Sequence, residues 1–209
     1  MFMMKNDLME INYRFGQWLL KLVQIQYYWL GYTLKGLIIG GLFPATATVF
    51  YLFHLWFENT QGRDFRISDV FQEQFKRTFK GSNVLGYLMT FALIVLWSNL
   101  QISKHFIQSP LLHYLLVLLL LLTLGTLLYL FPVYVRYELP CFYYVRQAIL
   151  LLLLNLLPTL AMLIGFFLVI GVMTFIPILL VFAGVPLIIL PISWFALVAI
   201  KKTESAKES

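Results

Sequence analysis

The stretch QAILLLLLNLLPTLAMLIGFFLVIGVMTFIPILLVFAGVPLIILPISWFALVAI, residues 147–200, contains no charged side chain. As one continuous helix it would be about 80 Å long, at roughly 1.5 Å per residue. The hydrocarbon core of a bilayer is only about 30 Å thick. The chain must therefore cross a membrane, turn and cross back, and Gly165, Gly171 and Pro177 lie where the turn is needed. We predict transmembrane helices at 148–171 and 177–200, followed by a polar tail at 201–209.

The composition of the whole chain supports this reading. Of its residues 61% are hydrophobic and 11% are charged, against about 25% charged in an ordinary soluble domain. We predict an all-α fold: a polytopic transmembrane helical bundle of five to six spans, with short loops and amphipathic interfacial helices, forming a single membrane domain over 1–209. The net charge of +6 fits loops held on the cytoplasmic side and does not require a nucleic-acid partner.

The N-terminal part of the chain predicts an amphipathic helix and then a helical hairpin. Residues 8–24 carry an apolar stripe at helical spacing, which suits either a helix lying in the headgroup region or an extension of the first span. Residues 25–57 form the hairpin, broken at 40–44 because Gly40, Gly41 and Pro44 disfavour helix. The second arm is short for a full span, so a re-entrant segment remains an alternative.

Residues 58–80 are predicted to form a cytoplasmic basic loop and helix. Phe71, Phe75 and Phe79 recur at helical spacing beside three basic residues, Lys76, Arg77 and Lys80. A helix of this kind lies on an anionic membrane surface or packs its Phe stripe beneath the bundle. Two more spans follow at 82–100 and 111–135, and the distribution of Lys and Arg predicts that both termini are cytoplasmic.

Four polar residues within or at the ends of the spans are candidates for function. Lys35 is the only charge well inside a predicted span, where it is either functional or extends its ammonium group to the membrane surface. Arg136 and Glu138 flank the inner end of a span and are expected to form a pair, either as a ligand or partner site or as an interfacial salt bridge. Asn155, near Pro158, is expected to hydrogen-bond between helices or to bind the carbonyl that the proline leaves free.

The sequence carries no pattern typical of catalysis or of cofactor binding. Cys141 is the single cysteine, and the histidines His54, His105 and His113 are scattered without the spacing of metal ligands. No two candidate acid–base groups share a span. We therefore expect no enzyme activity, no cofactor and no metal site.

Three stretches together resemble a known family: GLFPATA at 41–47, FKRTFKGSNVLG at 75–86 and LFPVYVRYEL at 130–139. In length, order and position they are similar to the YesL-like family of bacterial membrane proteins, a family with a domain of unknown function. The resemblance implies a multi-pass protein of the bacterial cytoplasmic (inner) membrane. Genes of this family commonly lie beside genes for carbohydrate uptake and polysaccharide degradation, which implies an accessory role.

Two functions follow as hypotheses. The first is a non-catalytic accessory or assembly component associated with carbohydrate uptake, whose partners are the lipid bilayer and the subunits of a sugar importer. The alternative is a small-solute transporter or channel with its site at helices broken by Pro and Gly. Transporters usually carry more polar lining than this chain offers, which favours the first hypothesis.

Overall fold

The computed structural model describes residues 2–58, 65–107 and 109–208; the side chains of 2–12, 14, 15, 106, 107, 207 and 208 lie outside this description. Over these residues the chain is helical and contains no strand, as the sequence predicts. The elements in order are α1 (Phe2–Lys35), α2 (Ile39–Glu58), α3 (Ile67–Ile102), the short π-helix η1 (Ser103–Ile107), α4 (Pro110–Arg136), α5 (Cys141–Leu154), α6 (Leu156–Phe175) and α7 (Ile178–Glu208).

The first two helices form a hairpin whose turn differs from the predicted one. Residues 8–24 belong to the continuous helix α1, and the chain reverses at 36–38 instead of 40–44. Leu37 and Ile38 take the left-handed conformation, with φ of 56° and 64°. A Cβ atom at Gly36 would overlap the backbone of Gly41, so the two arms approach as closely as they do because neither residue has a side chain.

Pro44 lies inside α2 and does not end it. A proline has no N–H to give to the carbonyl four residues earlier, and its ring crowds that carbonyl. Here that residue is Gly40, and Asn83 of α3 donates its Nδ2–H to the Gly40 carbonyl oxygen at 2.9 Å. A side chain from a neighbouring helix replaces the missing bond, which is how helices in membranes tolerate proline.

The polar break at Asn155 divides the predicted span 148–171 into two helices. Pro158 cannot bond to the carbonyl of Leu154, and α5 ends at that residue. Helix α6 then begins at Leu156, which places Pro158 in its first turn, where the missing N–H costs little. Helix α7 (Ile178–Glu208) contains a similar kink at Ala183, and it includes residues 201–208, which the sequence predicts as a polar tail.

The kink in α7 is bridged by a side chain of α1. Ala183 has non-helical backbone angles three residues before Pro186. Gln26, which is buried, accepts a hydrogen bond through its Oε1 from the backbone N–H of Val185 at 3.1 Å. A buried glutamine in an apolar helix therefore has a specific task, which is to bind a backbone group that the kink leaves unpaired.

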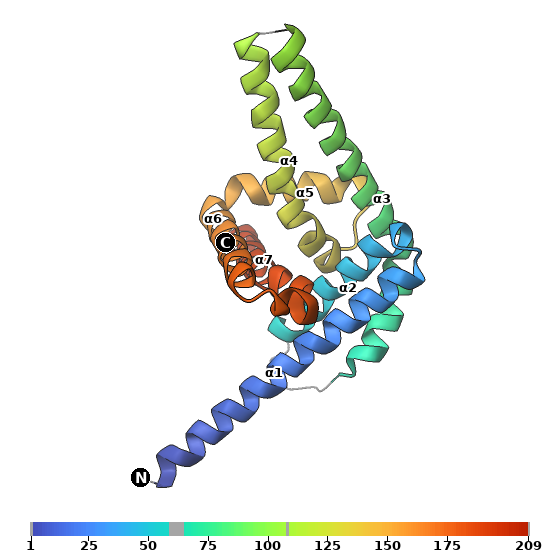
Figure 1. Ribbon diagram of the computed structural model, residues 1–209. Coiled ribbons are helices and arrows are strands. Elements are labelled where there is room, and N and C mark those ends of the chain that lie inside the picture. The colour runs from blue at the N-terminus through green and yellow to red at the C-terminus, as the bar shows by residue number, and fades with distance from the viewer. Residues whose placement is uncertain (1, 59–64, 108, 209) are drawn as a thin grey trace.

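Helix α2 is the centre of the molecule. It packs against α1, α3, α4 and α7. Half of the most apolar stretch of α2 is buried inside the protein, compared with 22% of the corresponding stretch of α3 and of α6. The largest side chains of the core, including Phe53, Phe71 and Tyr129, are fully buried around it. This core lies where α1, α2, the first half of α3 and the last half of α7 meet the second half of α4 and α5 (Figure 1).

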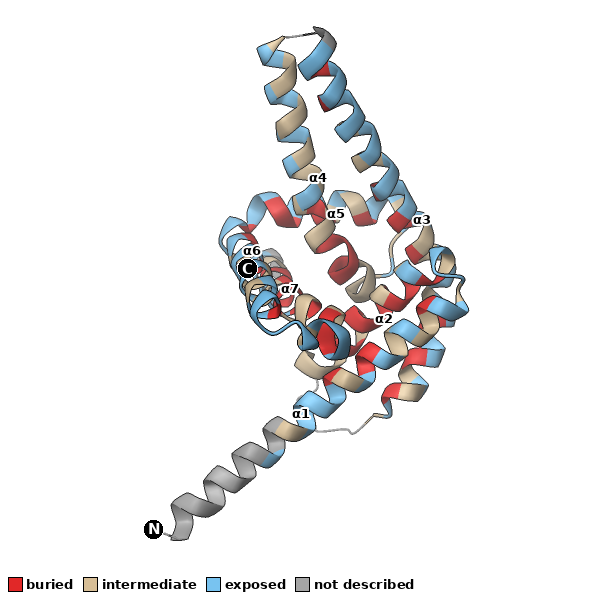
Figure 2. Ribbon diagram, in the orientation of Figure 1, coloured by how far each residue is buried: buried red, intermediate tan, exposed pale blue. Residues whose placement is uncertain are grey.

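Five helices of the described chain are long and apolar enough to cross a membrane: α2, α3, α4, α6 and α7. Figure 1 shows the α3–α4 hairpin extending well beyond the rest of the molecule. Most of that hairpin is exposed or only partly buried, and Figure 2 shows the same for α6. Apolar helices of this length with so much uncovered surface identify a multi-pass membrane protein.

Candidate functional site

The most polar part of the described interior is a cluster of charges where three helices end. Glu58 is the last residue of α2, Arg136 is the last residue of α4, and Glu204 lies near the end of α7. Arg136 donates from Nη1 to Glu58 Oε1 at 2.5 Å and from Nη2 to Glu204 Oε2 at 3.0 Å. The Arg136 side chain is only 24% exposed, so its charge depends on these two carboxylates more than a surface arginine would.

Three further side chains complete this ionic cluster. His54, one turn before Glu58 on α2, has its Nε2 3.1 Å from Glu58 Oε2. Lys201 Nζ lies 3.8 Å from Glu58 Oε1. Tyr137 donates its hydroxyl to Glu204 Oε1 at 2.8 Å. With a neutral histidine, the two acidic and two basic residues of the cluster balance each other.

The Tyr137 phenol is held in its neutral form. Burial raises its pKa well above the usual value, and the hydrogen bond to Glu204 acts in the same direction because it needs the phenolic proton. Tyr137 therefore serves as a hydrogen-bond donor and not as a base. The cluster joins the ends of α2, α4 and α7 and leaves no strong unpaired nucleophile or base within it.

A second polar group lies close by, at the break between α5 and α6. Asn155 is buried, and its Nδ2 donates to Thr203 Oγ1 at 3.0 Å. Thr159 donates its hydroxyl proton to the Asn155 carbonyl oxygen at 2.8 Å. Because that proton is used, Thr159 Oγ1 accepts a hydrogen bond from the Tyr129 hydroxyl, 2.9 Å away. The expected interhelical hydrogen bond of Asn155 is confirmed, and it connects this group to the residue before Glu204.

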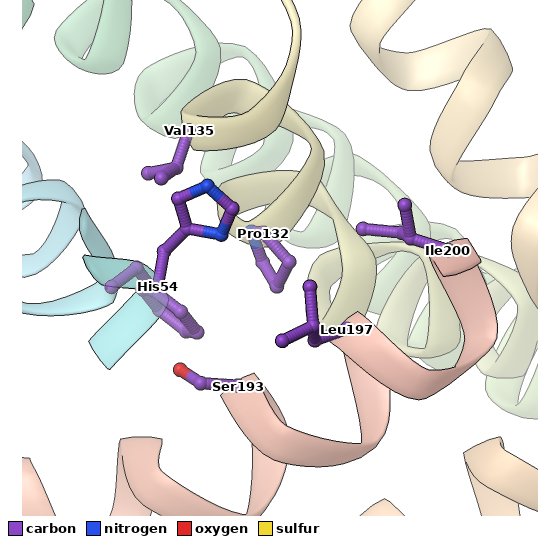
Figure 3. A pocket seen from close by; sticks show the side chains of 7 residues that line it. His54, Pro132, Val135, Ser193, Leu197 and Ile200 are labelled. Atoms are coloured by element: carbon purple, nitrogen blue, oxygen red, sulfur yellow. The ribbon is translucent and has the colours of Figure 1, made fainter. Parts of the chain in front are cut away.

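A small cavity adjoins the ionic cluster. Figure 3 shows His54 from α2, Pro132 and Val135 from α4, and Ser193 from α7 facing one another around it. Its volume is about 20 Å³, which is enough for one water molecule. The buried Ser193 hydroxyl has no partner among the described protein atoms, so a water there would satisfy it. A sugar needs a pocket of about 300 Å³ or more, so this cavity does not hold one.

The predicted pair Arg136–Glu138 is wrong. The chain leaves α4 in extended conformation at Tyr137, and this carries Glu138 away from the cluster to the surface of α3. There Glu138 binds Arg77 at 2.5 Å; the Arg77 side chain is 62% exposed and the Glu138 side chain is 86% exposed. Arg136 instead finds its partners on α2 and α7, at separations in sequence that no local pattern indicates.

The remaining candidates lie in separate places. Lys35 is exposed as the last residue of α1, with Nζ 4.7 Å from the centre of the Tyr32 ring, and a cation is favourable at the C-terminal end of a helix. Lys76, Arg77 and Lys80 are exposed on α3, which runs unbroken through residues 67–102. Phe71 and Phe75 from the same turns are buried against Tyr28 and Tyr32 of α1, which favours the packed alternative for this stripe.

Sequence reasoning missed Glu58, Glu204 and Tyr137, and it gave His54 no role. Each residue lies at or near the end of an apolar helix, which is a weak signal that many surface residues share. Among the described residues no three His, Cys, Asp or Glu side chains lie close enough together to hold a metal ion.

The three stretches that carry the family resemblance contact one another beside the core, where α2, α3 and the end of α4 pack together. The Phe43 ring stacks on Phe131 with centroids 6.5 Å apart. A Cβ atom at Gly86 would overlap the Phe43 ring, so glycine lets α2 and α3 approach. The Arg77–Glu138 pair joins the second stretch to the third. These segments therefore share a task in helix packing.

Comparison with known proteins agrees with this resemblance. Residues 22–100 match the family described as "Protein of unknown function, DUF624". The chain is 29% identical over 205 residues to the uncharacterized protein YesV of Bacillus subtilis (strain 168), and the match covers 97% of each chain. No solved structure matches.

Two further relatives come from the same strain of Bacillus subtilis. The uncharacterized protein YteU is 29% identical over 153 residues, which are 72% of this chain and 67% of YteU. The uncharacterized protein YesL is 28% identical over 124 residues, 59% of this chain, and the match spans only 58% of the length of YesL. These matches confirm the predicted resemblance.

Proposed function

We propose that this chain, a multi-pass membrane protein of the YesL-like family, is a non-catalytic accessory or assembly component associated with carbohydrate uptake. Its partners in this proposal are the lipid bilayer and the membrane subunits of a sugar importer. Its place is the bacterial cytoplasmic membrane.

One observation carries the proposal: the two apolar hairpins, α3–α4 and α6–α7, are largely uncovered, with no more than 33% of the apolar stretch of any of these helices buried. On the α3–α4 hairpin Trp97 is 59% exposed and Leu111 is 82% exposed, and on α6 Phe175 is 88% exposed. Such surfaces need an apolar environment, which lipid tails or the helices of a partner provide. The hairpins offer a large surface for association, while the ionic cluster holds the ends of α2, α4 and α7 together.

Both termini are cytoplasmic in this proposal. The ionic cluster brings the ends of α2, α4 and α7 to one side of the molecule. The basic residues Lys201 and Lys202 lie on that side with Arg136, and an excess of Lys and Arg is typical of the cytoplasmic face.

The link to sugars rests on the YesL-like resemblance, because genes of that family commonly lie beside carbohydrate-uptake genes. The transporter alternative is favoured by the helix breaks at Asn155 and Ala183, because transporters build their sites at discontinuous helices. Against it stands the cavity beside the cluster, whose volume of about 20 Å³ leaves room for water but not for a sugar.

Affinity purification from bacteria grown on a plant polysaccharide tests the proposal. The tagged protein is extracted in mild detergent, and its partners are identified by mass spectrometry. We expect the membrane subunits of a sugar importer to co-purify, and we expect Trp97→Ala together with Phe175→Ala to reduce their recovery. Tyr27→Ala is the matched control, since Tyr27 is an aromatic residue of α1 that is 62% exposed.

Two outcomes would overturn the proposal. In one, the intact protein elutes without importer subunits under all the growth conditions that induce the importer. In the other, the control variant loses these subunits as completely as the hairpin variant does, which would show that the hairpins are not the contact surface.

A further inference from the structure

A groove on the apolar surface of the protein runs between α3 and α5 and has a volume of about 500 Å³. The groove is separate from the ionic cluster, because the two share no residue. Its walls are apolar: Leu88, Met89 and Ala92 come from α3, and Val145, Ile149 and Leu150 come from α5. Met89 is buried at its base, whereas Leu88 and Leu150 are exposed.

One charged residue, Arg146, lines this groove. It is exposed, and among the described residues no carboxylate forms an ion pair with it. Arg77 and Arg136 differ in this respect, since each binds a glutamate. Phe142, one turn before Arg146 on α5, also lines the groove and is 78% exposed.

The position of the groove decides what fills it. Leu88, Met89 and Ala92 belong to α3, which is long and apolar enough to cross a membrane. In a membrane, a groove with these apolar walls opens to lipid. Its apolar walls suit an acyl chain. A guanidinium beside them needs a negative partner, and it binds phosphate through two parallel N–H donors.

We propose that the groove between α3 and α5 binds one anionic phospholipid, with an acyl chain against the apolar walls and the phosphate on Arg146. Phosphatidylglycerol has the required chemistry. Phosphatidylcholine also carries a phosphate, but its attached quaternary ammonium offsets the charge that Arg146 would bind. The groove therefore distinguishes the two lipids by headgroup charge.

Native mass spectrometry of the full chain in a nonionic detergent tests this site. Phosphatidylglycerol and phosphatidylcholine with identical acyl chains are titrated separately. We expect one phosphatidylglycerol per protein and weaker binding of phosphatidylcholine. Arg146→Gln is expected to weaken phosphatidylglycerol binding about fivefold, the effect of one basic residue near an anionic lipid. Ala92→Phe, which fills the groove, is expected to weaken both lipids.

Two control variants make the test specific. Arg66→Gln removes the same charge from another exposed position, and Ala161→Phe adds the same ring to a partly buried alanine of α6. Neither is expected to change phosphatidylglycerol binding. A milder variant, Ala92→Leu, is used in place of Ala92→Phe if the larger ring lowers the melting temperature of the protein.

The proposal is overturned if the two lipids bind the intact protein equally, or if Arg66→Gln weakens binding as much as Arg146→Gln. Equal effects of Ala161→Phe and the Ala92 variants would also overturn it. Displacement of the lipid by millimolar inorganic phosphate would show a simple anion site, in which the groove has no part.

Discussion

Arg136→Gln is the substitution that examines the ionic cluster most closely. The change removes the guanidinium that holds Glu58 and Glu204, and it leaves these two carboxylates near each other with Lys201 as the remaining cation, 3.8 Å from Glu58. A hydrogen bond to a charged group contributes about 1.5–3 kcal/mol. Because the side chains of Arg136, Glu58 and Glu204 are 24–34% exposed, water screens part of the attraction between them and reduces this contribution.

We expect a loss of about 3 kcal/mol in the free energy of unfolding, since the bonds of Arg136 to two carboxylates are lost but were partly screened by water. For a chain of this length that lowers the melting temperature by about 6–12 °C. The assay is thermal unfolding of the purified protein in detergent. Arg77→Gln is the matched control, because its partner Glu138 is 86% exposed, and an exposed pair contributes about 0–1 kcal/mol.

Double-mutant cycles identify the partners of Arg136. The double variant Arg136→Gln, Glu204→Gln should lose less free energy of unfolding than the sum of the losses in the two single variants, by about 1 kcal/mol or more. Arg136→Gln combined with Glu138→Gln should be additive within about 0.5 kcal/mol. The reverse result, with coupling to Glu138 and additivity with Glu204, would refute the geometry of the cluster.

Two further predictions concern α2 and the orientation of the chain. Asn83→Ala should lower stability by about 1–2 kcal/mol, because the Gly40 carbonyl loses its donor; thermal unfolding should show a much smaller effect in a Pro44→Ala background, where the backbone N–H returns. An equal effect in both backgrounds would contradict this account of the proline. In intact cells, with Cys141 replaced by serine, an impermeant thiol reagent should label a cysteine at Lys104 and not one at Lys202. Labelling at Lys202 alone would reverse the proposed orientation.

The sequence predicted those features that depend on composition and on local pattern. An uncharged run as long as 147–200 is compatible with few environments besides a membrane, so the helical membrane fold follows from it. For Asn155 the sequence predicts a hydrogen bond between helices or one to the carbonyl that Pro158 leaves free, because a buried amide near a proline in an apolar segment has few other options. The bond between helices is present, to Thr203.

Proline effects were harder to place, because the outcome depends on the neighbouring helix. Pro44 remains inside α2 because Asn83 supplies a donor to Gly40. Near Pro158 no described side chain of another helix binds the Leu154 carbonyl, and the helix breaks at Asn155. The two prolines look alike in sequence, and only the packing distinguishes them.

The ionic cluster could not be predicted from the sequence. Arg136 lies 78 residues from Glu58 and 68 from Glu204, and local spacing favoured the neighbouring Glu138. The choice among these glutamates depends on how α2, α4 and α7 end together, which is a property of the packed molecule. A charged residue at the end of an apolar helix is therefore a weak predictor of its partner.

Solute flux into proteoliposomes tests the proposed accessory function most directly. The purified chain is reconstituted alone, and uptake of labelled oligosaccharides released from a plant polysaccharide is measured against empty vesicles, with a reconstituted sugar importer as the positive control. We predict no uptake above that of empty vesicles by the chain alone, because an accessory component does not itself carry a solute, and the cavity beside the ionic cluster, of about 20 Å³, has room only for water. Saturable uptake by the chain alone would contradict the account and establish the transporter alternative.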